Sequence, residues 1–192
     1  AGAAEIYDRR HPSTAREAQG RVELRRARQA GAALHDAVAS GDDATVAAVL
    51  NVLGARRDVR RYRPDPVPPE TLRQVLNAGH QAPSVGHSQP WRFIVIKEQA
   101  TRDSAALLAD RERLRQADLF TPERRAMLLD LQLDGIREAP VGVVVACDRR
   151  TPPAGVLGRA SFADADVWSC ACAVENMWLA ARALGLGLGW VT

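Results

Sequence analysis

The chain has few aromatic side chains, a single lysine and three cysteines, and these shortages narrow the possible functions. Three phenylalanines and two tyrosines in 192 residues are too few for the interleaved aromatic and basic surface that binds nucleic acid. The cysteines lack the paired spacing of a metal site, so we expect reduced core thiols in a cytoplasmic protein, with a zinc site as the weaker alternative. No apolar run reaches the ~18 residues of a membrane span, and no signal peptide is visible. We therefore expect no nucleic acid, membrane or metal.

What the chain does have is a large apolar fraction and an excess of arginine. Its hydrophobic content of 46% over 192 residues is enough for one globular domain with a sizeable core. The formal net charge is +3, and Lys97 is the only lysine, so arginine supplies nearly all of the positive charge. A mildly basic protein of this kind suits an anionic ligand.

The densest charge lies in segment 56–64, which reads Arg-Arg-Asp-Val-Arg-Arg-Tyr-Arg-Pro. Its single carboxylate, Asp58, stands among five arginines. We expect Asp58 to be ionised near neutral pH, because neighbouring cations favour the charged form. Guanidinium groups present planar N–H donors that fit phosphate oxygens. Taken alone, the segment is also compatible with a solvated basic turn.

A second candidate segment is the loop 81–91, which contains two prolines, a glycine and several short polar side chains. It leads into 91–96, an apolar stretch that predicts a buried strand. Loops held by a rigid scaffold often bind ligands. Ser84 and Gln89 together offer donor and acceptor groups for the edge of a planar heterocycle. The same residues also fit an ordinary structured turn.

Hydrophobic periodicity predicts an α/β or α+β domain. We expect helices over 69–80, 101–119, 121–138 and 167–184, and strands over 91–96 and 141–148, with a third strand entered near Trp190. The stretch 141–148 does not alternate and should be buried on both faces. The last helix should lie in the core or in a subunit interface, where Glu175 and Asn176 would be buried and need partners. The glycines after it follow a helix and precede a strand, the reverse of a dinucleotide-binding fingerprint.

The N-terminal part carries less information. Residues 1–12 are predicted to be a linker or frayed end, and helix-forming composition follows from 13 onward, so 1–45 is expected to be a linker or a helical extension. Asp42 or Asp43 should cap a short helix that runs into the arginine segment. Because Thr192 comes just after an apolar run, we expect the chain to be a piece of something longer.

Several blocks of this sequence together resemble the flavin-binding nitroreductase-like superfamily. They are the segment 56–60, the loop 82–91 and the strand–helix–strand 138–192. Within it the chain is more similar to the 5,6-dimethylbenzimidazole synthases, a flavin-fragmenting family of cobalamin biosynthesis, because Asp58 and His87 stand where nitroreductases usually have Ser and Asn. The resemblance implies an α+β fold with a mixed central sheet flanked by helices. It also implies a homodimer with the flavin at its interface, and an FMN-binding domain over 46–192 that is truncated at its C-terminus.

The resemblance also implies roles for individual residues. Asp58 would be the catalytic acid/base, and Thr192 would supply a hydroxyl where the synthases have a catalytic Ser. Leu119 falls in a lid, at a place where some members have Met. The residues expected to contact FMN are Arg56, Arg57, Asp58, Val59, Arg60, Pro83, Ser84, Gln89, Leu119 and Leu133.

The implied activity is oxidative fragmentation of reduced FMN by O2. The products are 5,6-dimethylbenzimidazole, the lower ligand of cobalamin, and erythrose 4-phosphate, so FMN is consumed as a substrate. NAD(P)H would act indirectly, through a flavin reductase that supplies the reduced flavin. Two alternatives stay open: an NAD(P)H-dependent nitroreductase-type oxidoreductase that recycles FMN, and a non-catalytic flavin-binding module.

Overall fold

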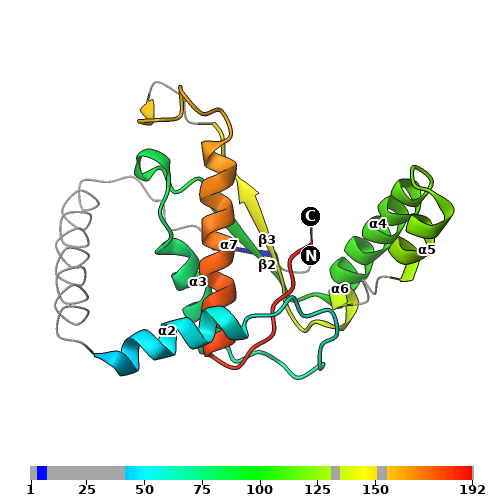
Figure 1. Ribbon diagram of the computed structural model, residues 1–192, viewed down its shortest axis with the longest axis horizontal. Helices are drawn as coiled ribbons and strands as arrows, with labels where there is room; N and C mark the ends of the chain where they lie inside the picture. Colours follow the sequence, from blue (N-terminus) through cyan, green and yellow to red (C-terminus); the bar gives the residue numbers. More distant parts are fainter. Residues whose placement is uncertain (1–3, 8–41, 131–134, 151–154, 192) are drawn as a thin grey trace. The chain divides into compact units, whose positions relative to one another are not determined.

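The computed structural model describes residues 4–7, 42–130, 135–150 and 155–191 (Figure 1). Contacts along the chain divide it into two units, one made of Ala1–Tyr7 with Arg56–Thr192, the other of Asp8–Ala55. The helix-forming stretch that begins at residue 13 lies outside the described residues. No helix in the described ranges is both long and apolar enough to cross a membrane.

The described element of the second unit is helix α2, Asp43–Ala55. It begins as predicted, because the Asp42 carboxylate accepts hydrogen bonds from the Thr45 backbone N–H and hydroxyl. Apolar side chains recur along the helix at i, i+3, i+4 and i+7, and all are at least 44% exposed: Val46, Val49, Leu50 and Leu53. Helix α2 thus presents an exposed apolar stripe.

The first unit is built on an antiparallel sheet in the order β1-β2-β3, with strands Ala4–Tyr7, Trp91–Ile96 and Gly142–Cys147. Trp91 pairs with Cys147 and Ile96 with Gly142, while Ala4–Tyr7 pairs with the other edge of β2. The linker predicted for residues 1–12 therefore contains a strand. Backbone pairing with an open sheet edge needs no particular side chains, so composition did not signal it.

Three other details of the predicted sheet are corrected. Val144 in the middle of β3 is exposed, so this strand is not buried on both faces. Near Trp190 the chain forms only an isolated parallel bridge, between Leu188 and Asp58, in place of a third strand. Both strand pairs of the described sheet are antiparallel, and parallel pairing is confined to that bridge, whereas a mixed sheet was expected.

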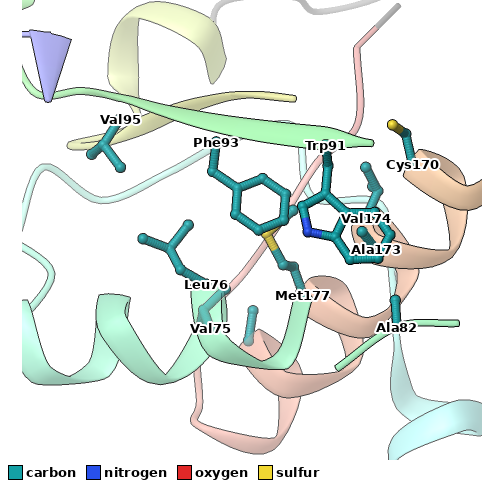
Figure 2. Packing of buried hydrophobic residues seen from close by; sticks show 11 residues of the cluster. Val75, Leu76, Ala82, Trp91, Phe93, Val95, Cys170, Ala173, Val174 and Met177 are labelled. Atoms are coloured by element: carbon teal, nitrogen blue, oxygen red, sulfur yellow. The ribbon is translucent and has the colours of Figure 1, made fainter. Parts of the chain in front are cut away.

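The core lies where helices α3, Pro69–His80, and α7, Ala165–Ala183, pack together and against the sheet (Figure 1). Strand β2 forms where it was predicted, and every second side chain, from Trp91 to Val95, is buried. The rings of Trp91 and Phe93 lie nearly parallel beside Met177 of α7 (Figure 2). A Cβ on Gly79 would come within 2.8 Å of Phe93 and 2.9 Å of Met177, so α3 can approach this closely only without a side chain there.

Helix α4, Gln99–Ala117, and helix α5, Pro122–Asp130, form a hairpin next to the short helix α6, Gly135–Glu138. Arg113 of α4 donates to the Leu129 carbonyl at 2.9 Å, and Arg137 of α6 pairs with Asp110 of α4 at 3.1 Å. The single helix predicted over 121–138 corresponds to α5 and α6. Leu133 lies between them, outside the described residues.

Candidate functional site

The arginine segment is attached to the chain that leaves helix α7. Asp58 and Leu188 form the parallel bridge, and the Val59 N–H donates to the Leu188 carbonyl at 3.1 Å. The Trp190 N–H donates to Asp58 Oδ1 at 3.2 Å, while the Arg60 guanidinium pairs with Asp58 Oδ2. The Asp58 carboxylate is therefore held by one backbone donor and one cation. One arginine of the segment, Arg60, therefore lies directly beside this carboxylate.

Gly189 allows the two segments to approach. A Cβ at this position would lie 2.3 Å from the Val59 carbonyl oxygen, 2.6 Å from the Tyr62 hydroxyl and 3.3 Å from Asp58 Oδ1. Real Cβ atoms do not come that near to a backbone oxygen, so only glycine fits without a shift of the chain. Gly189 is one of the glycines after α7 that do not fit a dinucleotide fingerprint, and this close packing is its structural role.

Tyr62 closes the turn that carries Asp58. Its hydroxyl donates to the Val59 carbonyl at 2.8 Å, and its backbone N–H donates to Glu138 Oε2 at 3.0 Å. Burial raises the pKa of Tyr62, and the nearby Asp58 charge adds to the rise. The Tyr62 N–H, and after it the Arg61 guanidinium at 2.9 Å, lower the pKa of Glu138. Arg61 thus anchors the segment to α6, and the picture of five arginines around Asp58 is corrected.

Helix α7 holds the two arginines at the start of the segment. The Arg56 guanidinium carbon lies 4.5 Å from the centre of the Trp178 ring, and Arg56 Nε lies 3.4 Å from Glu175 Oε1. The Trp178 indole N–H donates to the Arg57 carbonyl at 3.2 Å. The two terminal nitrogens of Arg56 bind no described residue. They form a planar pair of donors of the kind that binds phosphate oxygens.

Glu175 and Asn176 both have partners, as the sequence predicted, but both are only partly buried, whereas burial was expected. The Glu175 side chain is 44% exposed and pairs with Arg56, while the Asn176 amide donates to the Ala78 carbonyl at 3.2 Å. Sequence analysis did not assign a role to Trp178. No pattern in the chain joins it to Arg57, which is 121 residues away.

In the loop 81–91, the Ser84 and Gln89 side chains use only some of their hydrogen-bonding groups within the described part of the chain. Ser84 Oγ accepts from the Gln89 backbone N–H at 3.0 Å, and Gln89 Nε2 donates to the His80 carbonyl at 3.1 Å. In the described chain nothing accepts the Ser84 hydroxyl proton, and nothing donates to Gln89 Oε1. One donor and one acceptor therefore remain for a planar ring edge. Pro83 beside them is exposed.

The conformation of this loop is set by helix α7 and by the segment before it. The Val85 N–H donates to Ser169 Oγ at 3.0 Å, and Ser169 in turn donates to the Ala165 carbonyl. Gly86, with φ of +50°, packs so closely on residue 157 that a Cβ would lie 2.8 Å from the Leu157 backbone nitrogen. His87 and Gln89 also adopt positive φ, a strained choice that a well-supported loop can keep.

Leu119, Leu133 and Thr192 are the remaining predicted site residues. Leu119 is 75% exposed at the end of α4, and Leu133 and Thr192 lie outside the described residues. A shallow depression of about 390 Å³ on the α4–α5 hairpin is lined by Phe120, Arg124, Met127 and Leu128, none of which was predicted to be in the site.

The cysteines occupy three different environments. Cys170 is buried, Cys147 is partly buried and Cys172 is exposed, so the expectation that all three lie in the core is wrong for Cys172. Burial raises the pKa of Cys170 to about 12, which keeps this thiol protonated and unreactive. Among the described residues no group of His, Cys, Asp and Glu is arranged to hold a metal ion.

The chain is similar in sequence and in fold to several known flavin-related proteins. A 5,6-dimethylbenzimidazole synthase of Rhodospirillum rubrum is 42% identical over 139 residues, which are 71% of this chain and 65% of that protein. A second synthase, from Rhodobacter capsulatus, is 36% identical over 76% of this chain and 70% of its own length. A Desulfovibrio desulfuricans protein solved in complex with FMN is 31% identical with a TM-score of 0.50, and the match covers 75% of this chain and 67% of that one.

The chain spans about two thirds of the length of these synthases, 65% of the first and 70% of the second. The model of the Nitroreductase family matches residues 53–192, which include the arginine segment, the polar loop and helix α7. The predicted superfamily and its α+β fold are therefore confirmed: the chain belongs to the nitroreductase family.

Proposed function

We propose that this chain carries out the reaction of 5,6-dimethylbenzimidazole synthase, the oxidative fragmentation of reduced FMN by O2. The observation that carries the proposal is the Asp58 carboxylate, which is held by the Trp190 N–H and the Arg60 guanidinium. It directly follows Arg56 and Arg57 in the chain, and Arg56 has the donor geometry that binds phosphate. The resemblance noted above places Ser at the position of Asp58 in ordinary nitroreductases. The two synthases at 36–42% identity support the same assignment.

The residues fit FMN at both of its ends. Arg56 offers two terminal nitrogens that bind no described residue, and Arg57 and Arg60 are near it in the sequence, which suits a phosphate dianion. Ser84 retains a donor and Gln89 an acceptor, which suits the carbonyl–amide edge of the isoalloxazine. Val59 lies between Asp58 and Arg60, and exposed Pro83 offers a flat apolar surface to the ring. The phosphate and the ring edge of the ligand thus each have a chemically matched partner.

Asp58 is assigned the proton transfers of the reaction. Reduced FMN supplies both the electrons for O2 and the atoms of the two products. The Trp190 N–H and the Arg60 guanidinium orient the carboxylate of Asp58 for the removal of a proton. A well-placed acid/base of this kind contributes about 10²- to 10⁴-fold in rate. Thr192 is proposed to supply a second hydroxyl to the same site.

The remaining assignments follow from the same proposal. The FMN-binding domain would occupy residues 46–192, preceded by an extension over 1–45 that adds β1 to the sheet. The protein would form a homodimer with flavin at the interface, and the exposed stripe of α2 supports a partner surface. Leu119 would belong to a lid, and Leu133 would contact FMN. The protein would be cytoplasmic. A flavin reductase that uses NAD(P)H would supply the reduced FMN.

Product analysis after aerobic incubation with reduced FMN tests the proposal. We expect 5,6-dimethylbenzimidazole to appear while intact FMN disappears in equal amount, both followed by chromatography. The nitroreductase alternative predicts that FMN is only reoxidised and is fully recovered, and that result would overturn the synthase assignment.

Asp58→Asn separates the enzyme from a non-catalytic flavin-binding module. Because the amide cannot accept a proton as the carboxylate does, we expect product formation to fall by about 10²-fold or more. FMN binding should persist, since Arg56 and Arg57 are unchanged. A variant that forms product at the wild-type rate would contradict the role of Asp58.

A further inference from the structure

Two side chains of helix α7 contact the start of the arginine segment and have no role in the reaction as proposed above. Trp178 is 7% exposed, and Glu175 lies one helical turn before it on the same side of α7. The contacts of both are directed at residues 56 and 57. Such convergence on two arginines points to a role in positioning them.

Together, Trp178 and Glu175 restrict the Arg56 guanidinium from two directions. The indole ring covers one face of the guanidinium at 4.5 Å, and Glu175 occupies the Nε edge at 3.4 Å. A cation stacked on an aromatic face is attracted by the quadrupole of the ring. The edge that carries the two terminal nitrogens is left for a ligand, because no described residue binds them.

Trp178 also acts on the neighbouring residue through the backbone. Its indole N–H donates to the Arg57 carbonyl at 3.2 Å, so one buried side chain holds the Arg56 side chain and the Arg57 main chain at once. Arginine loses side-chain entropy when it is immobilised by a ligand. A guanidinium that is already immobilised in the free protein loses less on binding, and the ligand binds more tightly for that reason.

We propose that Trp178 and Glu175 are positioning residues that pre-orient Arg56 and Arg57 for the phosphate group of FMN. This inference rests on the proposed function, because it requires a phosphate ligand at these arginines. It adds that Trp178 strengthens phosphate binding, whereas the negative charge of Glu175 weakens it by partly neutralising Arg56. The pair therefore adjusts how strongly the site distinguishes a phosphorylated flavin from an unphosphorylated one.

Comparison of FMN with riboflavin isolates the contribution of the phosphate, because the two ligands share the ring and the ribityl chain. Dissociation constants are measured by quenching of flavin fluorescence with the full chain. In Trp178→Leu we expect FMN to bind about tenfold more weakly, from the loss of the stacking contact and one hydrogen bond, and riboflavin to change by less than about twofold. Trp178→Phe keeps an aromatic face and should give a smaller loss for FMN alone.

Trp168 provides a matched control on the same helix. It is 56% exposed and contacts the Phe162 ring, with centroids 5.6 Å apart, away from the arginine contacts of Trp178. Trp168→Leu removes an indole from α7 in the same way, and we expect it to leave both flavin affinities unchanged. Equal weakening of FMN and riboflavin in Trp178→Leu would overturn the inference, since it would show only a packing role.

Glu175→Gln tests the contact between Glu175 and Arg56. Glu175 is half-exposed, so this substitution is not expected to cause misfolding. The amide oxygen can still accept from Arg56 Nε, but the charge that opposes the phosphate is gone. We expect FMN to bind about twofold to fivefold more tightly, with riboflavin unchanged. An unchanged or weakened FMN affinity would contradict the inference.

Arg56→Ala distinguishes failure of this inference from failure of the proposed function. If Arg56→Ala weakens FMN selectively while Trp178→Leu does not, the phosphate site stands and the positioning role is rejected. If Arg56→Ala leaves the preference for FMN over riboflavin intact, these arginines do not bind phosphate, and both proposals are rejected.

Discussion

The carboxylate of Asp58 depends on a glycine 131 positions later. Trp190 donates to that carboxylate only because the chain at Gly189 passes directly against Val59 and Tyr62. The contact is backbone to backbone, so it cannot be relieved by a side chain moving aside. Small residues at such crossings are part of the site although they carry no functional group.

Gly189→Ala should therefore be strongly destabilising for its size. A Cβ 2.3 Å from the Val59 carbonyl oxygen forces the two segments apart, and we expect the free energy of unfolding to fall by about 1–3 kcal/mol. Chemical denaturation monitored by tryptophan fluorescence measures the change.

Gly54→Ala is the control for the glycine substitution itself. Gly54 lies inside helix α2, and a Cβ there would meet nothing within 4 Å. Alanine is favoured over glycine in a helix, so we expect no loss of stability and a gain of up to about 1 kcal/mol. Equal losses at positions 54 and 189 would contradict the crossing argument.

At the scale of elements, helix α7 connects the two parts of the site. Its first turn holds the polar loop, through Ser169 and the Val85 N–H. About two turns later it holds the arginine segment, through Glu175 and Trp178. Because a helix is rigid over this length, the spacing of the two contacts along α7 sets the relation between a phosphate end and a ring end.

Ion pairs join the start of strand β2 to the end of strand β3. Asp148, just after β3, pairs with Arg92 of β2 at 2.7 Å and with Arg150 at 2.8 Å. Hydrogen bonds from Arg150, and the charge of Arg92, hold the pKa of Asp148 well below its usual range. A carboxyl whose pKa is lowered on folding stabilises the folded state above its unfolded pKa of about 3.9.

Acid should therefore remove this stabilisation. As the pH falls below about 4, the unfolded chain takes up a proton at Asp148 more readily than the folded chain, and stability decreases. We expect Asp148→Asn to be less stable than wild type at pH 7, and the difference to shrink at pH 3. Thermal unfolding of both proteins between pH 3 and 7 measures it, and a difference independent of pH would argue against the ion pair.

At the scale of the whole molecule, the exposed apolar stripe on α2 bears on the proposed homodimer. Val46, Val49, Leu50 and Leu53 are each nearly half or more exposed. Contiguous apolar surface of this kind usually marks an interface. The spacing is helical, so the stripe would be removed from water by one elongated contact.

Leu50→Asp should weaken self-association. A charge in the middle of the stripe costs several kcal/mol if it is buried without a partner, so sedimentation should show the variant shifted toward monomer. Asn51→Asp adds the same charge on the opposite side of α2 and should leave association unchanged. A wild-type protein that stays monomeric at all concentrations would rule out the proposed dimer.

Much of the fold could be predicted because it depends on local pattern. Periodicity placed α3, α7 and β2 to within a few residues, since helix and strand repeats can be seen in any single stretch of chain. The arginine segment and the polar loop were also recognisable, because charge density and proline-rich composition are local properties. Strand β1 was missed because edge pairing needs no side-chain signal.

The sequence by itself thus determined most of the segments that form elements and those that carry polar chemistry, because these properties depend on neighbours within a few positions. Only the tertiary structure decided which carboxylate meets which donor. The bonds from Trp178 to Arg57 and from Trp190 to Asp58 span 121 and 132 residues. No local pattern encodes such pairs. They arise when the packing of α3 and α7 on the sheet brings distant backbone together, and the close approach at Gly189 then selects the contact.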